Sequence, residues 1–595
     1  MSNSPEQHSE GLITCSIYSE NAKIKDHFGV ISLWVRKEIN RIGKAQLVLE
    51  AGNMPKQEIL ESEDETFAPG KHIRIEAGYK GSQNVIFEGI ITSHGVEIAE
   101  SEDLLIIECR DFAYPTTLSR KNRIFEKKKD SDAIKTILGE YSKLEPTVKD
   151  TNATYNELVQ YYCSDWDFIL SRADMNGLFV ITEGKKISID MPKYNASAVL
   201  TVTYGKDMLA FKGDLETEEQ LIAAEAVAWD STKQKLIKAS GSSTALNKQG
   251  SQSPKELAGT VGKRKAVLQT TAISDETILK SWADAQMQKT GLARIRGEVK
   301  FQGNADIALG NVIELAGLSK RFNGNAYIGM VEHEIKEGSW VTTAGLGVSP
   351  SNITENTDVV APLAAGLLPG IQGMHIGKVV AIEGDPDKEN KIQIMLPILN
   401  GETNKVWARL ATLWASNQYG GFFIPDVGDE VVVGFFNNDP CHAVILGSLY
   451  SSKQPPANKI EAKNNIRSII TRSKLKLEFE EEKKIITIQT PGKNTIEISD
   501  EGKSITISDQ NKNKIEMSAS GIKIESEGSL LLKAKTGIEI NAGTSIEMKG
   551  KSAINMKSAN IEAKADMAFT AKGGAQAELS AGGQAVIKGA MVMIN

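Results

Sequence analysis

The chain is poor in cysteine and in uninterrupted apolar runs. Its four cysteines among 595 residues are scattered and form no CxxC pair, which argues against a disulfide framework or a zinc ribbon and suits a reducing compartment. The longest apolar run, 359–373, is broken by Pro362, Pro369 and three glycines, so it is too interrupted to span a bilayer. The first residues, MSNSPEQHSEG, hold neither a basic n-region nor an apolar h-region, and we expect no secretory signal peptide.

Charge and composition narrow the classes further. The formal net charge of −7 argues against nucleic acid as the main partner. The chain is 41% hydrophobic and 24% charged, which is ordinary for a soluble protein, and its length allows about three to five domains. Aromatic residues make up only 6% and there are 51 glycines, a balance that favours β-structure with many turns.

No grouping of side chains points to catalysis. The seven histidines lie apart in the sequence, and His333, inside an expected strand, should make a structural hydrogen bond. Asp165 and Asp167 stand where a helix begins, so we expect them to cap it. The acidic stretch 384–391 lacks the central glycine and final glutamate of a calcium loop and favours a hairpin turn. We therefore expect no enzyme, no cofactor and no metal ligands, and leave open whether a metal lies on the axis of the repeat region described below.

The first 360 residues are predicted to be a β-rich region with some helix. Alternating runs between residues 11 and 120, such as KHIRIEAGY and DLLIIECRDF, predict a β-barrel. A second barrel is expected at about 230–350, from runs such as ARIRGEVKFQG and NAYIGMVEHEIKEG. Helical material is expected between the two barrels.

Three segments of this region predict helices. CSDWDFILSRADMNG offers Ser164 as N-cap and Asp167 as its capping-box partner, and Gly177 should end the helix. TEEQLIAAEAVAW and SDETILKSWADAQMQKTG also have helical character.

A short linker, 361–373, leads to a second compact β unit at 374–456. Its expected strands lie in HIGKVVAIEG, NKIQIMLPIL, KVWARLAT, GDEVVVGFFN and HAVILGSLY. Five short strands in so few residues favour a small closed barrel of the oligonucleotide/oligosaccharide-binding (OB) type. The basic groove with exposed aromatic residues that single-stranded nucleic acid requires is missing, so Tyr419, Phe422 and Phe423 are expected to pack the neck of the molecule.

The rest of the chain, 457–595, is a repeat region. From residue 475 on there is one proline and no tryptophan, tyrosine or cysteine. Strand-turn units recur every nine or ten residues, and from about residue 522 apolar pairs recur every eight, with one step of seven. A fixed period over ten units is the mark of a repeat architecture. The predicted inward-facing residues are Ile522, Ile524, Leu530, Leu532, Ile538, Ile540, Ile546, Met548, Ile554 and Met556.

An eight-residue unit supplies one short strand and one corner. A single stack of such strands is a flat sheet and cannot enclose a core. Three stacks, one for each side of a triangle, form a β-prism with apolar residues inside. Either one chain supplies three octads per coil, or three chains supply one side each. We favour three chains, because the inward residues are nearly uniform in size, as a three-fold axis requires. Ten layers at a strand spacing of about 4.8 Å then give a stiff shaft of about 50 Å.

The predicted shaft ends in uncharged residues. The last layer of a strand stack leaves backbone groups unpaired, and a flat apolar platform favours a cap. We therefore expect a separate small protein to bind this platform; a frayed tail that binds nothing is the alternative. The expected contact residues are Met591, Val592, Met593, Ile594 and Asn595.

Several segments share motifs with one known family. The most specific is YGGFFIPDVGDEVVVGFFNNDPCHAVILGSLYSSKQPP at 419–456, with KIQIMLP and VWARL upstream. FAPGKHIRIEAGY, VQYYCSDWDFILSRADMNGLFV and YIGMVEHEI extend the match to nearly the whole chain. These segments resemble VgrG, the trimeric spike protein of type VI secretion systems, which is related to the hub and spike proteins of contractile phage tails. The octads depart from the family in being rich in Ile and Met, and we expect no toxin domain in this chain, unlike in many relatives.

The resemblance implies a homotrimer with a hub (1–360), an OB neck (374–456) and a prism needle (457–595). It implies three kinds of further partner: a PAAR-repeat tip protein, an Hcp-like tail-tube protein with its baseplate, and effector proteins or their adaptors. Nucleic acid is not among them, and a target membrane would be contacted only mechanically. The protein would wait in the cytoplasm and be expelled by sheath contraction, which would explain export without a signal peptide.

Other interpretations stay open. The same plan serves phage-tail-like elements and extracellular injection particles. A trimeric adhesin or tail fibre would need a receptor domain at its distal end. A polysaccharide lyase on a β-helix would need longer coils with clustered Asp, Lys and Arg.

Overall fold

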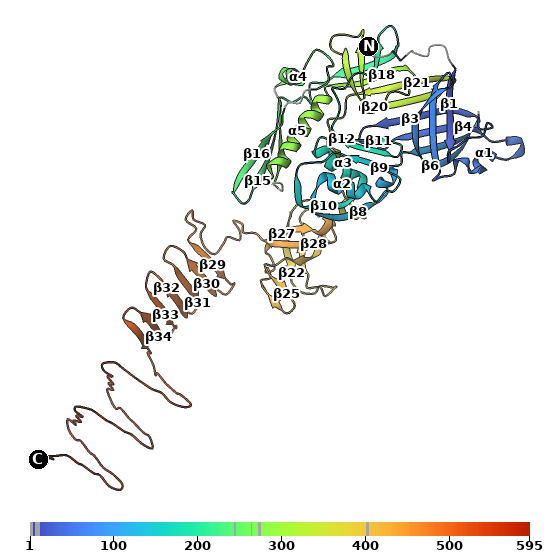
Figure 1. Cartoon of the computed structure of the whole chain (residues 1–595). Helices are drawn as coiled ribbons and strands as arrows, with labels where there is room; N and C mark the ends of the chain where they lie inside the picture. Colours follow the sequence, from blue (N-terminus) through green and yellow to red (C-terminus); the bar gives the residue numbers. More distant parts are fainter. Residues whose placement is uncertain are drawn as a thin grey trace. The chain divides into compact units, whose positions relative to one another are not determined.

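A computed structural model describes residues 4–5, 12–100, 102–242, 246–262, 264–271, 275–399 and 404–594. The chain forms two compact units, Met1–Leu449 and Tyr450–Asn595. Strands are the main regular element of both units (Figure 1), so the predicted mainly β class is confirmed. None of the helices in the described ranges combines the length and apolar character that a membrane crossing requires.

A large sheet organises the first unit. It joins the two strand-rich segments expected to form separate barrels, because β20 pairs antiparallel with β3, with His333 opposite Val35. Buried Leu47, Ile75 and Ile107 belong to one core beside it. The sheet strands are β1 Ile13–Ser19, β2 Ala22–Lys23, β3 Val30–Glu38, β4 Lys44–Ala51, β5 His72–Tyr79, β6 Ser82–Ile98, β7 Asp103–Arg110, β13 Leu200–Thr203, β14 Met208–Leu215, β18 Ile295–Gln302, β19 Val312–Ala316, β20 Gly324–Lys336 and β21 Ser339–Leu346. A short helix, α1, spans Leu60–Glu63.

Two helices and two small sheets form a second layer of the unit. The predicted helix after Ser164 is confirmed as α3: the Ser164 hydroxyl accepts the backbone N–H of Asp167 at 3.0 Å. The chain leaves the helix through Gly177, which has a φ of 68°, a conformation that favours glycine. The elements are β8 Arg120–Lys129 paired with β10 Thr154–Ser164, β9 Glu145–Val148 with β11 Phe179–Glu183 and β12 Lys186–Asp190, and helices α2 Asp130–Leu138 and α3 Asp165–Met175.

The segment TEEQLIAAEAVAW was predicted to be helical, and that prediction is wrong. It forms β15, Ala223–Asp230, in a sheet with β16 Lys235–Ser240 and β17 Lys265–Thr270. Small side chains alternate along β15, and buried Ala224, Ala226 and Ala228 share a core with α5, Glu276–Leu292. Packing against a helix therefore overrides the helix propensity of alanine. Helix α5 itself was predicted and is confirmed, and α4 spans Pro254–Val261.

The predicted five-strand barrel is confirmed. It closes in the order β22-β23-β24-β28-β27 around buried Val379, Ile394, Val433 and Ile445. Its strands are β22 His375–Ala381, β23 Ile392–Met395, β24 Lys405–Leu410, β27 Glu430–Phe435 and β28 Ala443–Ser448, and a small hairpin of β25 Ala415–Ser416 and β26 Tyr419–Gly420 leaves it between β24 and β27.

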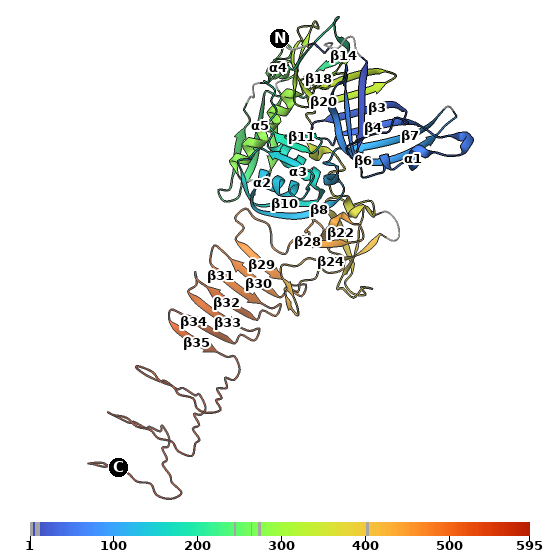
Figure 2. The ribbon, with the colours of Figure 1, turned by 45° about the vertical axis from the view of Figure 1, so that its right-hand side comes forward.

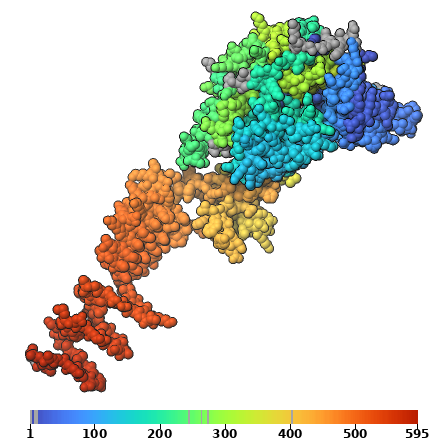
Figure 3. All heavy atoms as spheres, viewed as in Figure 1, coloured from blue at the N-terminus to red at the C-terminus, as the bar shows by residue number. Residues whose placement is uncertain are grey.

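The second unit contains an antiparallel meander of seven strands, in chain order (Figure 2). They are β29 Ile466–Ile470, β30 Lys476–Glu480, β31 Ile485–Gln489, β32 Thr495–Ser499, β33 Ser504–Ser508, β34 Lys514–Ser518 and β35 Gly521–Glu525. Residues 526–594 form no strand and run as open switchbacks (Figures 1 and 3). The alternative of three octads per coil in one chain is thus not formed. Octad strands need a hydrogen-bonding neighbour, and this segment offers none to itself.

Candidate assembly surface

One face of the seven-stranded sheet carries apolar side chains on every strand, and its one charged residue is Arg467 on the edge strand β29, opposite Phe479. Side chains alternate along each strand, and the register places apolar residues opposite each other from strand to strand. Ile488 pairs with Ile496, and Ile496 with Ile507. Two parallel columns result, which we call the apolar face: Ile469, Leu477, Ile488, Ile496, Ile507, Ile515 and Ile524 in one, and Phe479, Ile486, Ile498, Ile505, Met517 and Ile522 in the other.

The opposite face is polar and suited to water. Its central column runs Glu478, Thr487, Glu497, Thr506, Glu516 across neighbouring strands. Threonine separates each glutamate from the next, which avoids like charges directly opposite each other. The sheet is therefore two-sided, with one face ready for solvent and the other requiring cover.

Within the part of the second unit that the structure describes, no segment covers the apolar face. Ile488 is 49% exposed and Ile498 42% exposed, although both lie in the middle of the sheet. No apolar side chain in residues 450–594 is buried. Burying one large apolar side chain is worth roughly 1.5–3 kcal/mol, so covering thirteen partly exposed ones would stabilise the sheet substantially.

The turns of the meander repeat an unusual residue, a lysine with a positive φ. Five successive turns each hold one lysine in the left-handed region, with φ between 48° and 69°: Lys474, Lys484, Lys493, Lys503 and Lys512. Such positions favour glycine or asparagine. Sequence reasoning found the nine-to-ten-residue unit but missed this lysine, which recurs in the first five of the six hairpins.

The predicted prism-core residues fall into two groups. Ile522 and Ile524 lie on β35, on the apolar face. The other eight lie outside any strand, and each is more than half exposed. Their enclosure by three chains stays a prediction.

The predicted cap-binding residues are also uncovered. Met591, Met593 and Ile594 are each at least 80% exposed, and Val592 is half exposed. Asn595 lies outside the described residues. A cap on these residues stays a prediction.

A buried acid in the first unit was only partly anticipated. Asp165 was expected to cap a helix, but its carboxylate is fully buried and accepts four hydrogen bonds. Donors are Lys121 Nζ at 2.7 Å, Tyr141 Oη at 2.7 Å, Gln160 Nε2 at 2.8 Å and Arg123 Nη2 at 3.3 Å. Burial alone would raise its pKa, but these donors hold the pKa of Asp165 below its ordinary value. The cluster ties β8 and β10 to α3, so its role is structural.

His333 has the structural role that the sequence predicts. Its Nδ1 lies 2.9 Å from the hydroxyl of Thr342, and its ring packs on Trp340. Burial lowers its pKa to about 3, so the ring is neutral. Similarly, Asp385 shapes the loop between β22 and β23: it accepts the backbone N–H groups of Asp387, Glu389 and Lys391.

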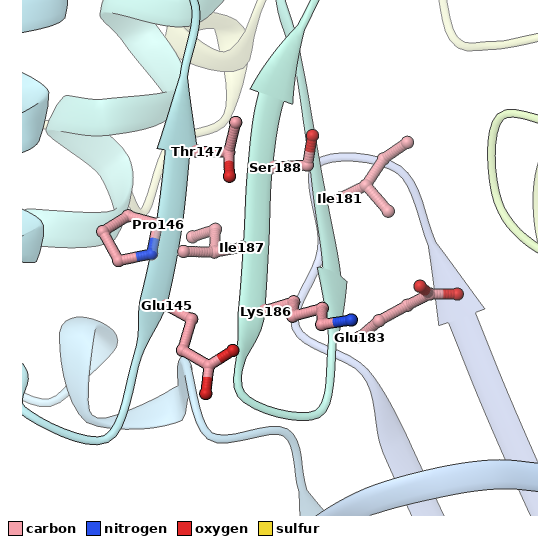
Figure 4. Close-up of a pocket in the computed structure, with 8 residues that line it drawn as sticks. All are labelled: Glu145, Pro146, Thr147, Ile181, Glu183, Lys186, Ile187 and Ser188. Atoms are coloured by element: carbon pink, nitrogen blue, oxygen red, sulfur yellow. The ribbon is translucent and has the colours of Figure 1, made fainter.

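A pocket of about 350 Å³ lies on the small β9-β12-β11 sheet (Figure 4). Glu145, Glu183 and Lys186 provide its charges, and Thr147 and Ser188 its hydroxyls. No histidine or cysteine lines it to activate a hydroxyl. Within the described ranges, no cluster of three or more His, Cys, Asp or Glu is placed to hold a metal ion. The apolar face and the exposed octads are therefore the candidate interaction surfaces of this chain.

Three family models match successive segments of the chain. A family model described as the Alg8 N-terminal domain matches residues 9–337. The type VI secretion system/phage-baseplate injector OB domain matches 375–450, and the phage baseplate V C-terminal trimerisation domain matches 485–560. The trimerisation match covers most of the sheet that carries the apolar face.

Individual relatives agree with these matches. The actin cross-linking toxin VgrG1 of Vibrio cholerae is 36% identical over 95 residues, which are 15% of this chain and 9% of that protein. The type VI secretion system spike protein VgrG1b of Pseudomonas aeruginosa is 25% identical over 193 residues, 29% of this chain and 25% of that protein. The chain thus spans a quarter or less of the length of these relatives.

Among solved structures, the Francisella PdpA-VgrG complex aligns with 87% of this chain and 88% of its own, at 10% identity and a TM-score of 0.39. The family models and the curated spike proteins together confirm the resemblance to VgrG. The chain belongs to the family of the Alg8 N-terminal domain, it matches an injector OB domain and a baseplate trimerisation domain, and it is similar in sequence to VgrG spike proteins.

Proposed function

We propose that three copies of this chain assemble into the spike of a contractile injection machine of the type VI secretion kind. The observation that carries the proposal is the apolar face. It runs through seven strands in register, the described residues of its own unit leave it uncovered, and it lies largely within the match to a trimerisation domain. Three such sheets facing a common axis would bury all three faces together.

The octads would continue the same rod. Their apolar pairs recur every eight residues, so a strand from each copy can stack on a strand from the next copy. Each backbone N–H and C=O then finds a partner that one chain cannot supply. A shaft bonded in this way along its whole length resists bending, which is what a puncturing needle requires.

The chain's part in this machine would be mechanical. Residues 1–360 would form the hub on an Hcp-like tail tube and baseplate, and residues 591–595 would hold a PAAR-type tip protein. Effectors or their adaptors would travel on the spike, so the chain itself needs no catalytic site. Sheath contraction would carry it from the cytoplasm into the surroundings or a target cell.

A spike of a phage-tail-like or extracellular injection particle is the second candidate. The match to an OB domain described for both type VI systems and phage baseplates favours keeping it. A trimeric adhesin is a weaker alternative.

The test uses two neighbouring residues on β33 that face opposite sides of the sheet. Ile505 belongs to the apolar face and Thr506 to the polar face. Light scattering on the purified full chain should give three times the mass of one copy. Ile505→Lys should give single copies, because it places a charge at the shared axis. Thr506→Lys, the matched control, should stay trimeric, because it places the same charge between Glu497 and Glu516. A wild-type chain that runs as a monomer would refute the proposal.

A further inference from the structure

The OB barrel carries an arm without charge. No charged residue stands between Arg409 and Asp426, in a chain that is 24% charged overall. We call residues 412–425, which include β25 and β26, the aromatic arm. Leu413 is fully exposed and Phe422 is 86% exposed, and Trp414, Tyr419 and Phe423 are also exposed. An uncharged, exposed aromatic cluster of this size marks an interaction site.

The arm is folded, although its side chains face water. Ala415 pairs with Gly420 and Ser416 with Tyr419. The backbone N–H of Gly421 donates to the carbonyl of Trp414 at 2.8 Å, and the rings of Trp414 and Tyr419 meet edge to face at 5.5 Å. A shaped apolar surface loses little conformational entropy on docking, so the arm is prepared for a partner.

The outer wall of the same barrel carries an apolar patch. On β27, Val431 and Val433 are buried, so Val432 points outward. Ile376 on β22 is its cross-strand partner and is 53% exposed. Leu446 on β28 is exposed at the irregularity where β28 pairs with β27. We call Ile376, Val432 and Leu446 the wall patch.

The arm and the wall patch are exposed in the same chain, so they do not cover each other within one copy. Two different surfaces that complement each other between copies form a head-to-tail contact, and such a contact closes into a ring when the rotation fits. The trimerisation domain that follows the barrel in the chain sets a three-fold rotation. We infer that the aromatic arm of each copy docks on the wall patch of the next copy and closes a three-membered ring of OB barrels. This inference rests on the trimer proposed above.

The chain connection makes such a contact favourable. Residues 450–465 join the barrel to β29, and sixteen residues span at most about 55 Å even when fully extended. Three barrels tied to one rod would therefore face each other at an effective concentration on the order of millimolar. A contact too weak to hold free barrels together is sufficient under these conditions.

Cysteine cross-linking on the full chain tests the ring. Cys441 is exposed, so Cys441→Ser serves as the background. Into it go Phe422→Cys on the arm, Leu446→Cys on the wall patch, or both. After treatment with a short bismaleimide, the double variant should run as covalent dimers and trimers on a denaturing gel. Each single variant should run as one copy.

Two results would overturn the inference. The first is a chain that light scattering shows to be trimeric but whose double variant gives no links between copies. The second is efficient linking by Phe422→Cys alone, which would place the arms against each other at the axis. A monomeric mass in light scattering would instead remove the proposed trimer itself, and the ring with it.

Discussion

Asp130 and Arg172 form a buried ion pair, with Oδ1 of Asp130 2.6 Å from Nε of Arg172. The pair joins the first residue of α2 to the last turn of α3. Nη2 of Arg172 also donates to the hydroxyl of Tyr155 at 2.7 Å, and Nδ2 of Asn176 donates to Asp130 at 2.8 Å. Burial raises the pKa of Tyr155 to about 12. Arg172 is the cation that neutralises Asp130 in this group, so removing Arg172 leaves the buried carboxylate with neutral partners alone.

Arg172→Met should therefore destabilise the first unit by about 3–5 kcal/mol, because it strands the Asp130 carboxylate in a buried site. Asp130→Asn combined with Arg172→Met should cost less than Arg172→Met alone, because the buried charge is gone. Urea unfolding of the full chain, followed by tryptophan fluorescence, measures both. Equal losses in the single and double variants would contradict this account.

His333 predicts a pH dependence. Its pKa in the folded protein, about 3, lies below its unfolded value of about 6.5. The folded state therefore binds fewer protons between these values. The stabilising contribution is complete above pH 6.5 and falls by about 1.4 kcal/mol per pH unit as the pH drops toward 3.

His333→Gln should remove this slope, and it can be measured between pH 6.5 and 4.5, above the range in which most carboxylates titrate. Calorimetric melting curves of the full chain provide the reading. The exposed His27 supplies the control, since His27→Gln should keep the wild-type slope. An unchanged slope in His333→Gln would mean that another titratable group causes the pH dependence of stability.

Arg120 holds the segment that leads to the OB barrel. Its guanidinium donates to the carbonyls of Asp358 at 2.7 Å, Tyr162 at 3.0 Å and Val360 at 3.2 Å. Arg120→Ala should free this segment, and limited proteolysis should then cut within 358–373 several-fold faster than in the wild type. Lys127→Ala, an exposed change on the same strand, should not alter the rate. Equal cutting in both variants would show that Arg120 does not restrain the segment.

The exposed residues 591–594 give the last prediction. Deleting 591–595 should abolish co-purification with a co-expressed PAAR-repeat protein, because the apolar contact is lost. Light scattering should still show the trimer, because the apolar face on β29–β35 is intact. A complex that survives the deletion would place the tip protein elsewhere.

Strands defined by alternation were predictable from sequence, and long-range pairing was not. KHIRIEAGY and DLLIIECRDF each became a strand of the expected kind, because alternation reflects burial on one face of a sheet. That β20 would pair with β3, almost 300 residues away in sequence, leaves no local signal. The same limit applies to β15, where contact with α5 decided between helix and strand.

The period of the repeat region led to the prism-core prediction, whose enclosure by three chains stays a prediction. The octad pattern pointed to surfaces that one chain cannot bury, and the exposed Ile522 and Ile524 agree with that. The buried role of Asp165 was missed, because its partners Lys121 and Tyr141 come from separate elements. Local sequence shows a helix start, and only the fold brings the basic and phenolic groups to it.

The uncovered apolar face also has a consequence for synthesis. Units that carry their own cores, such as the OB barrel, can mature as soon as they leave the ribosome, whereas in the proposed trimer the C-terminal sheet would wait for other subunits. Its completion would then depend on how often nascent copies meet, so expression level would govern the yield of the proposed trimer. Translation of several copies from one messenger RNA would shorten the wait and limit aggregation of single copies through their exposed apolar faces.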